Sequence, residues 1–352
     1  MNTAIVSDYS AAPQTAKRKR GIRFYIGRSL KWLGIGLFAL AVLGVVYQTI
    51  ATEMDKGNYA PHGQLYTVNG HQMHLYCVGE GSPTVILEAG AFSYSSEWYW
   101  VQNQLAVTHH VCAYDRPGNG WSEAVDGPRD GLTLVHELHD LLAEANVSSP
   151  YILAGHSLGG VLNRIYAAQY PDEVLGLALV DSAVPLTWPD ISGYEEYKSA
   201  NQSAVTLMTV LERTSALRII LGNEFRGYGY PAAVAAELTA LKSTSMAVAT
   251  WDAEVRLAQW ELSRQAEAAE DLGALPIVVM WAGHPEITAE EDRTKLEAIW
   301  DSVPAFSSNN VVCYVEGADH GSIIGSEQYA QQVTAAILDV IASAQTGEPL
   351  TR

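Results

Sequence analysis

Residues 151–160, YILAGHSLGG, decide the fold of this chain. The first four are apolar and form a run typical of a buried strand, and residues 158–170 have a helical pattern that ends at Pro171. The turn between them fits G-x-S-x-G, which places Ser157 on a sharp turn from strand to helix. Glycines on both sides avoid the clash that a Cβ atom would make in so tight a turn. We therefore predict that Ser157 is a nucleophile at the positive end of a helix dipole.

Strand and helix patterns alternate on both sides of this turn. Further strands are predicted on either side of Asn69-Gly70 and at 84–88, 110–114, 174–180, 276–281 and 311–315, and further helices at 96–106, 131–146, 289–301 and 326–343. Such alternation predicts an α/β fold with a parallel sheet that carries helices on both faces.

One stretch breaks the alternation. The 94 residues between Asp181 and Pro276 hold Ala-rich helical segments and scattered aromatic residues, with little strand pattern. We expect a helical cap inserted at about 184–271 within a catalytic domain of residues 63–352. The aromatic residues are most simply explained as contacts that pack this cap on the core.

Six segments resemble the α/β-hydrolase superfamily, and they occur in the superfamily's order. They are MHLYCVGEG, PTVILEAG, CAYDRPGNGWSE, YILAGHSLGG, LVDSAVP and VEGADHGS. The resemblance covers nearly all of residues 63–343 and is greatest to bacterial membrane-anchored serine α/β-hydrolases of undefined substrate. It implies a mostly parallel sheet of eight strands. It also implies that the loop DRPGNGWS at 115–122 is a structural turn beside Ser157.

The serine needs a base and an acid, which in this fold follow it in the order acid, then histidine. His320 lies in GADHG just past the last predicted strand, where the resemblance also places the catalytic base. Two acids compete. Asp181 ends the strand after the nucleophile helix, and Glu286 follows the next strand. We favour Asp181, which matches an acid position used by some superfamily members, and leave Glu286 open.

An oxyanion hole needs two backbone N–H groups. Leu158, the residue after the nucleophile, is expected to supply one. The second should come from the loop EAGA after the strand 84–88, where the matched donor is Ala91. Because this loop departs from the His-Gly that superfamily members often carry, Phe92 stays an alternative.

The N-terminal region has the features of a membrane anchor. Trp32–Ala51 is a run of 20 uncharged residues, enough for a helix to cross the hydrocarbon core. The preceding tail, 1–31, carries seven basic residues and one acidic residue, so the N-terminus is expected in the cytoplasm and the body outside it. Residues 52–62 would be a linker. A cleaved signal peptide is the main alternative, although its apolar region is usually shorter, about 7–15 residues.

Charge and cysteine content exclude some functions. The net charge of −18 contains a tail of +6, so the body carries −24 and nucleic acid is not an expected partner. Three cysteines, Cys77, Cys112 and Cys313, form no C-x-x-C pair, and no metal or cofactor is expected. One disulfide is compatible with a body outside the cytoplasm. We do not predict a Cys77–Cys112 bridge, because sequence alone does not place their Cα atoms.

These features predict a serine hydrolase that cleaves a carboxylic ester, or a related acyl bond, through an acyl-enzyme on Ser157. Its partner would be a small, apolar acyl substrate, and the sequence does not indicate an oligomeric state. A peptidase or C–C hydrolase would use the same residues. A dehalogenase or epoxide hydrolase would carry Asp at position 157. A membrane-tethered binding protein without activity is the alternative from another class.

Overall fold

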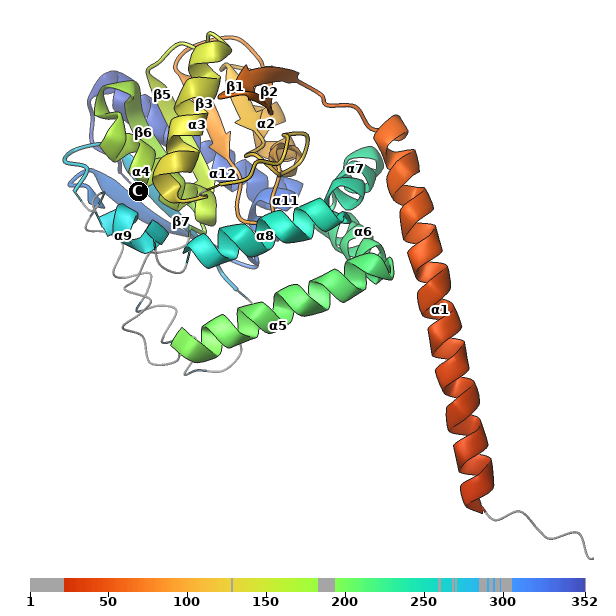
Figure 1. Ribbon diagram of the computed structural model, residues 1–352. Coiled ribbons are helices and arrows are strands. Elements are labelled where there is room, and N and C mark those ends of the chain that lie inside the picture. The colour runs from red at the N-terminus through yellow and green to blue at the C-terminus, as the bar shows by residue number, and fades with distance from the viewer. Residues whose placement is uncertain are drawn as a thin grey trace, which may run out of the picture.

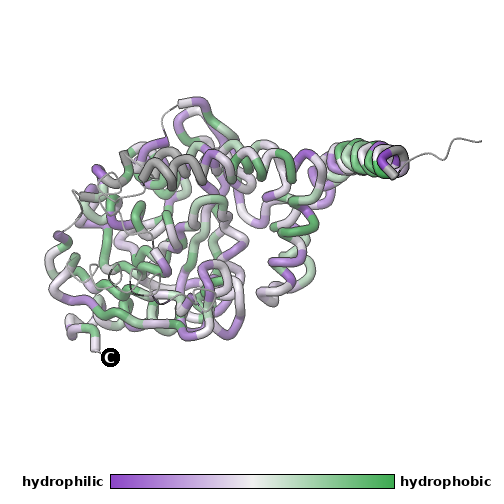
Figure 2. The backbone as a smooth tube through the Cα atoms, turned by 90° about the horizontal axis from the view of Figure 1, so that it is seen from below, coloured by the Kyte–Doolittle hydropathy of each residue, from purple (hydrophilic) through white to green (hydrophobic). Residues whose placement is uncertain are grey.

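The computed structural model describes residues 22–127, 129–182, 194–258, 261–267, 269, 271–284, 290, 294, 298 and 306–351. A long helix, α1 (Ile22–Asn58), stands beside a body built around one sheet (Figure 1). The stretch Tyr25–Asn58 is long and apolar enough to cross a membrane, and little of it is buried against the body. Figure 2 shows its apolar turns outside the body. Residues 52–58, expected in a linker, continue this helix.

Eight strands form the sheet. They are β1 (Gln64–Val68), β2 (His71–Val78), β3 (Thr84–Glu88), β4 (Val111–Tyr114), β5 (Tyr151–His156), β6 (Val174–Val180), β7 (Ile277–Ala282) and β8 (Asn310–Val315). Their spatial order is β1-β2-β4-β3-β5-β6-β7-β8, antiparallel at β1–β2 and β2–β4 and parallel elsewhere. The predicted mostly parallel sheet of eight strands is confirmed.

Helices cover both faces of the sheet, as its alternating side chains require. On β5, Leu153 packs on the face that carries α3 (Gly131–Glu144) and α4 (Leu158–Gln169). Ile152 and Ala154 point the other way, toward α2 (Tyr99–Leu105) and α12 (Glu327–Thr346). The described part of the body also holds three short helical turns: η1 (Ser95–Trp98), η2 (Pro171–Glu173) and α11 (Ser322–Gly325). The helix expected at 289–301 lies mostly outside the described residues.

Among the described residues between β6 and β7, where the sequence predicts a cap, there are five helices. They are α5 (Tyr194–Arg213), α6 (Ala216–Tyr228), α7 (Ala232–Lys242), α8 (Ser245–Ala258) and α9 (Glu261–Glu267). α6, α7 and α8 share a small apolar core of their own that includes Leu221, Phe225 and Leu238. Phe92 and Trp100 of the body pack against this core, so the cap is fastened to the end of the sheet where β3 ends.

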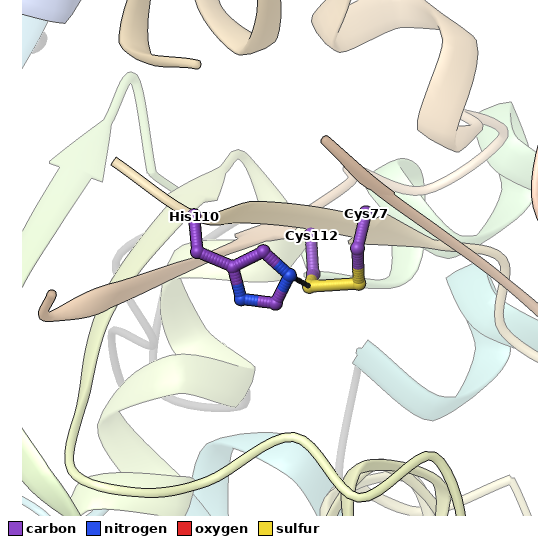
Figure 3. A group of neighbouring side chains, drawn as sticks. All are labelled: Cys77, His110 and Cys112. Carbon is purple, nitrogen blue, oxygen red and sulfur yellow. Dashed lines mark hydrogen bonds between the residues drawn. A yellow bond between two sulfur atoms is a disulfide. The ribbon is translucent and has the colours of Figure 1, made fainter. Parts of the chain in front are cut away.

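A disulfide joins Cys77 of β2 to Cys112 of β4, contrary to our expectation (Figure 3). The two residues are direct partners across the antiparallel pair, with Cα atoms 4.0 Å apart, so their side chains lie next to each other on one face of the sheet. The His110 ring lies beside them, and the ligand atoms of all three residues fall within 4.8 Å of one another. With its sulfurs bonded to each other, the group offers no thiolate ligand for a metal. Cys313 is buried and is not part of this disulfide.

Candidate active site

Ser157 occupies the turn between β5 and α4. Its backbone has φ 54° and ψ −121°, and its N–H donates to Val180 O of the neighbouring strand at 3.0 Å. A Cβ atom on Gly155 would come within 2.5 Å of the Gly159 backbone, and one on Gly159 within 2.3 Å of Glu88 O. The glycines on either side of the serine are therefore required by close backbone contacts, and they hold a half-buried hydroxyl at the N-terminus of α4.

His320 and Asp181 meet at the carboxyl ends of β8 and β6. The Nδ1–H of His320 donates to Asp181 Oδ2 at 2.6 Å. The Asp181 side chain is 3% exposed and that of His320 is 52% exposed, so the acid is enclosed while the imidazole remains open to a reactant. The structure thus pairs the histidine predicted as base with the favoured acid. Glu286, the other candidate acid, lies outside the described residues.

His156 connects the loop that carries His320 to the elbow, the sharp turn between β5 and α4 that carries Ser157. Its Nε2–H donates to the backbone oxygen of His320 at 2.8 Å, and the two ring centroids are 4.6 Å apart. Burial, with the nearby His320 as a smaller effect, lowers the pKa of His156 to about 3, so the ring is neutral. Since His156 directly precedes Ser157, this bond fixes the His320 loop beside the serine.

A second imidazole, His284, also contacts Asp181. Its Nε2 lies 3.2 Å from Oδ2 and 3.3 Å from Oδ1, and the Ala282 N–H donates to Oδ1 at 3.0 Å. Burial alone would raise the pKa of Asp181, but the hydrogen bonds from His284 and His320 outweigh it and hold that pKa far below its usual range. Sequence reasoning missed His284. One indication of it was present in the sequence: the histidine of AGHPE lies three residues beyond the predicted strand 276–281.

Backbone strain concentrates at this place. Seven non-glycine residues of the described part have positive φ. Four of them are Phe92 (55°), Ser157 (54°), Asp181 (43°) and His284 (47°), which follow β3, β5, β6 and β7 respectively. Such conformations cost about 1–3 kcal/mol each and persist where the surrounding structure determines them, most often at functional sites.

The loop after β3 packs directly on the serine. A Cβ atom on Gly90 would lie 3.0 Å from Ser157 Cβ and 3.2 Å from His156 Nδ1. The Phe92 N–H already donates to Glu254 Oε2 at 3.2 Å. Of the two candidate donors on this loop, Phe92 therefore already has an acceptor. Leu158 is the first residue of α4, so its N–H has no acceptor within the helix.

A buried arginine holds this loop from behind. Arg116 donates to the carbonyl oxygens of Ala89 at 2.6 Å and Gly90 at 2.7 Å, and it pairs with Glu88 Oε1 at 2.6 Å. Burial raises the pKa of Glu88, and Arg116 offsets only part of that rise. By binding the carbonyl oxygens, the guanidinium fixes the peptide orientation of the loop that faces the serine. The segment 115–122 therefore acts as the structural support predicted for it.

Glu254 brings the cap into the same network. This residue of α8 is 1% exposed. Its Oε1 accepts from Arg116 Nε at 2.8 Å and from Asn119 Nδ2 at 2.8 Å, while its Oε2 accepts from the Phe92 N–H. One cap carboxylate therefore binds both the loop beside the serine and the arginine that supports that loop. No local sequence pattern indicated Glu254.

A family model of the α/β-hydrolase fold matches residues 83–308, which is more than half of the chain. An uncharacterised protein of Schizosaccharomyces pombe is 32% identical over 164 residues, which cover 38% of this chain and 31% of that protein. The chain thus spans less than a third of this curated relative.

Solved structures share the fold at low identity. An esterase from Thermogutta terrifontis superposes with a TM-score of 0.59 and 17% identity, covering 80% of this chain and 99% of the esterase. A membrane phospholipase A superposes with a TM-score of 0.56 and 19% identity, covering 91% of this chain and 99% of that one. An epoxide hydrolase and an Acinetobacter baumannii protein described as a putative lipase also share the fold. With the family model spanning most of the sheet and the turn that carries Ser157, the chain belongs to the α/β-hydrolase fold family.

Proposed function

We propose that this hydrolase cleaves a carboxylic ester, or a related acyl bond, through an acyl-enzyme on Ser157. The observation that carries the proposal is the 2.6 Å hydrogen bond from His320 to buried Asp181, in a loop that His156 fastens beside the elbow serine. Asp181 orients the imidazole so that Nε2 faces the reactant. His320 then takes the Ser157 proton as the hydroxyl attacks the acyl carbon.

The charge that develops on the carbonyl oxygen is bound by the N–H groups of Leu158 and Ala91. One such donor is worth about 3–4 kcal/mol of barrier. His320 returns its proton to the leaving alcohol or amine, and a water molecule deprotonated by the same imidazole cleaves the acyl-enzyme. Serine at 157 disfavours the epoxide hydrolase reaction of some structural neighbours, because the nucleophile there would be a carboxylate.

We propose further that α1 anchors the enzyme in a membrane, with the tail 1–31 in the cytoplasm and the catalytic domain outside. The apolar run and the basic residues before it support this orientation. The Cys77–Cys112 disulfide is typical of an oxidising compartment. Relatives of similar sequence include a vacuolar membrane protein of Saccharomyces cerevisiae, and the membrane phospholipase A shares the fold. An apolar acyl substrate of low water solubility fits this location.

A serine-directed fluorophosphonate tests the reaction class. We expect the detergent-solubilised wild type to be labelled and to hydrolyse p-nitrophenyl esters, with the preferred chain length defining the acyl pocket. Ser157→Ala should lose both properties, while Ser343→Ala, a buried serine of α12, should keep them. Folded wild type that resists labelling would reject the serine mechanism and favour a binding protein on this fold.

A further inference from the structure

The cap touches α1 within the stretch proposed to cross the membrane. Ser215, in the turn between α5 and α6, donates through Oγ to Gly44 O at 3.1 Å. A Cβ atom on Gly44 would come within 2.4 Å of Thr214 O, so glycine is what allows the turn to lie directly on the helix. Figure 1 shows the ends of α5 and α6 against α1 at this level.

This contact lies well inside the apolar run. Gly44 precedes Ala51, the last residue of the uncharged run, by seven residues, or about 10 Å along the helix axis. If the membrane ended below the cap, only residues 32–43 would remain in the hydrocarbon, about 18 Å of helix, whereas the core is about 30 Å thick. Shifting the helix to compensate would bury Lys31 and Arg28.

The surface around the turn is suited to lipid. Four large aliphatic side chains are exposed here: Leu207 (58% exposed) and Val210 (55%) on α5, and Ile219 (65%) and Ile220 (48%) on α6. Arg213, in the last turn of α5, is exposed beside them. No charged residue occurs between Ser199 and Leu211 of α5. We call the four aliphatic residues and the turn between them the cap tip. Exposed apolar residues gathered beside a helix that can cross a membrane are candidates for contact with lipid.

Of the charged groups near the cap tip, Arg218 has a charged partner and Arg213 lines a hollow beside α1. Arg218 pairs with Asp55 at 2.7 Å, in the part of α1 beyond the apolar run. Arg213 lines a hollow of about 230 Å³ between α1 and the cap, together with Glu212 and Glu53. Arginine can place its charge at the interface while its aliphatic stem stays in the apolar layer.

We propose that the cap tip inserts into the lipid leaflet beside α1, so that the bilayer itself is the partner of this surface. This inference rests on the proposed anchor. α6 then leads from the lipid to the catalytic loop. This helix is 13 residues long, about 20 Å. Tyr228, at its far end, contacts the loop that carries His320: a Cβ atom on Gly321 would be 2.5 Å from the Tyr228 hydroxyl. A substrate embedded in the leaflet is thereby presented close to His320.

Spin labels measure the depth of each position in the full-length protein. Single cysteines at Val210 and Ile219 would be labelled in a Cys313→Ala background and reconstituted in phosphatidylethanolamine–phosphatidylglycerol vesicles. We expect a several-fold higher ratio of oxygen to nickel-chelate accessibility at both positions than at Val107, an 82% exposed residue of the body. A label at Phe38 of α1 reports on the anchor.

The outcomes separate the two proposals. Lipid-level accessibility at Phe38 with water-level accessibility at Val210 and Ile219 would overturn insertion of the cap tip while leaving the anchor intact. Water-level accessibility at Phe38 would overturn the anchor and the insertion together. As a functional measure, Ile219→Glu should lower turnover of a long-chain ester in vesicles by about tenfold, since a charge in the apolar layer is costly. Turnover of a soluble short-chain ester should not change.

Discussion

Replacing Glu254 by glutamine should impair both stability and catalysis, although this residue is on the cap and contacts no reacting atom. The carboxylate accepts hydrogen bonds from three donors, on buried Arg116 and Asn119 and on half-buried Phe92. An amide keeps the shape but offers one oxygen, so its NH2 group must face at least one of these donors. Arg116 would keep its ion pair with Glu88 but lose its ion pair with the carboxylate at position 254.

The expected size follows from these contacts. A buried donor left without an acceptor costs about 1–3 kcal/mol. Breaking a buried ion pair outright costs about 3–5 kcal/mol, of which the remaining Glu88 offsets a part. We expect Glu254→Gln to lower the free energy of unfolding by about 3 kcal/mol. Since the loss of a whole oxyanion donor reduces kcat about 10²–10³-fold, a loosened loop should reduce kcat by about 10–100-fold with little change in KM.

Denaturant unfolding in detergent and ester hydrolysis measure the two effects side by side. Glu212→Gln is the matched control, because Glu212 is also a buried cap glutamate but bonds Ser245 Oγ at 3.2 Å and no residue of the loop beside Ser157. It should cost less than about 1.5 kcal/mol and leave kcat unchanged. A Glu254→Gln protein with the stability and kcat of the control would refute the idea that the cap supports the loop.

Three further predictions concern the acid, a neutral histidine and the disulfide. Asp181→Asn should lower kcat for ester hydrolysis about 10⁴-fold, because an amide favours the wrong tautomer of His320, and Glu286→Gln should not. The reverse result would make Glu286 the acid of the triad. Because His156 has a pKa of about 3 when folded and about 6.5 when unfolded, the unfolded chain binds the extra proton between these values. As the pH falls from about 6.5 to about 3, His156 should therefore lower the free energy of unfolding by about 1.4 kcal/mol per pH unit. His156→Gln should make this slope less steep in unfolding titrations. Replacing Cys77 and Cys112 by serine removes a disulfide between residues 35 positions apart and should lower the free energy of unfolding by about 3–4 kcal/mol. Equal denaturation midpoints of this variant and the wild type would contradict the presence of the bond.

The elbow was predictable because its determinants are local. Strand, tight turn and helix occur within the stretch 151–170, and the close contacts around Gly155 and Gly159 explain why those positions are glycine. The pairing of Asp181 with His320 followed from where each stands after its strand, since parallel strands bring their carboxyl ends to one edge of the sheet. The resemblance to a known family supplied the same positions.

Contacts between distant segments were not predictable in this way. The bond from Arg116 to Glu254 joins residues 138 apart and depends on how the cap docks, which no periodicity encodes. The disulfide depends on the register of β2 on β4, because a shift of one residue would move the Cys77 side chain to the other face. For α1, the charged residues after the apolar run suggested a linker, but helix continues through them to Asn58.

The cap connects the anchor to both loops of the site. α6 starts where Ser215 contacts α1 and ends where Tyr228 lies beside the His320 loop. α8 starts just after Ser243, whose carbonyl accepts a bond from Gln48 of α1, and carries Glu254 to the loop beside the serine. Helices packed at native density transmit displacement rather than absorb it. If α1 spans the membrane as proposed, the base and the oxyanion loop are held at a fixed height above the lipid. A membrane anchor that only raised the local concentration of enzyme would not need the contacts of Ser215 and Ser243 with α1. These contacts, at the starts of α6 and α8, therefore support a site positioned to take its substrate from the bilayer.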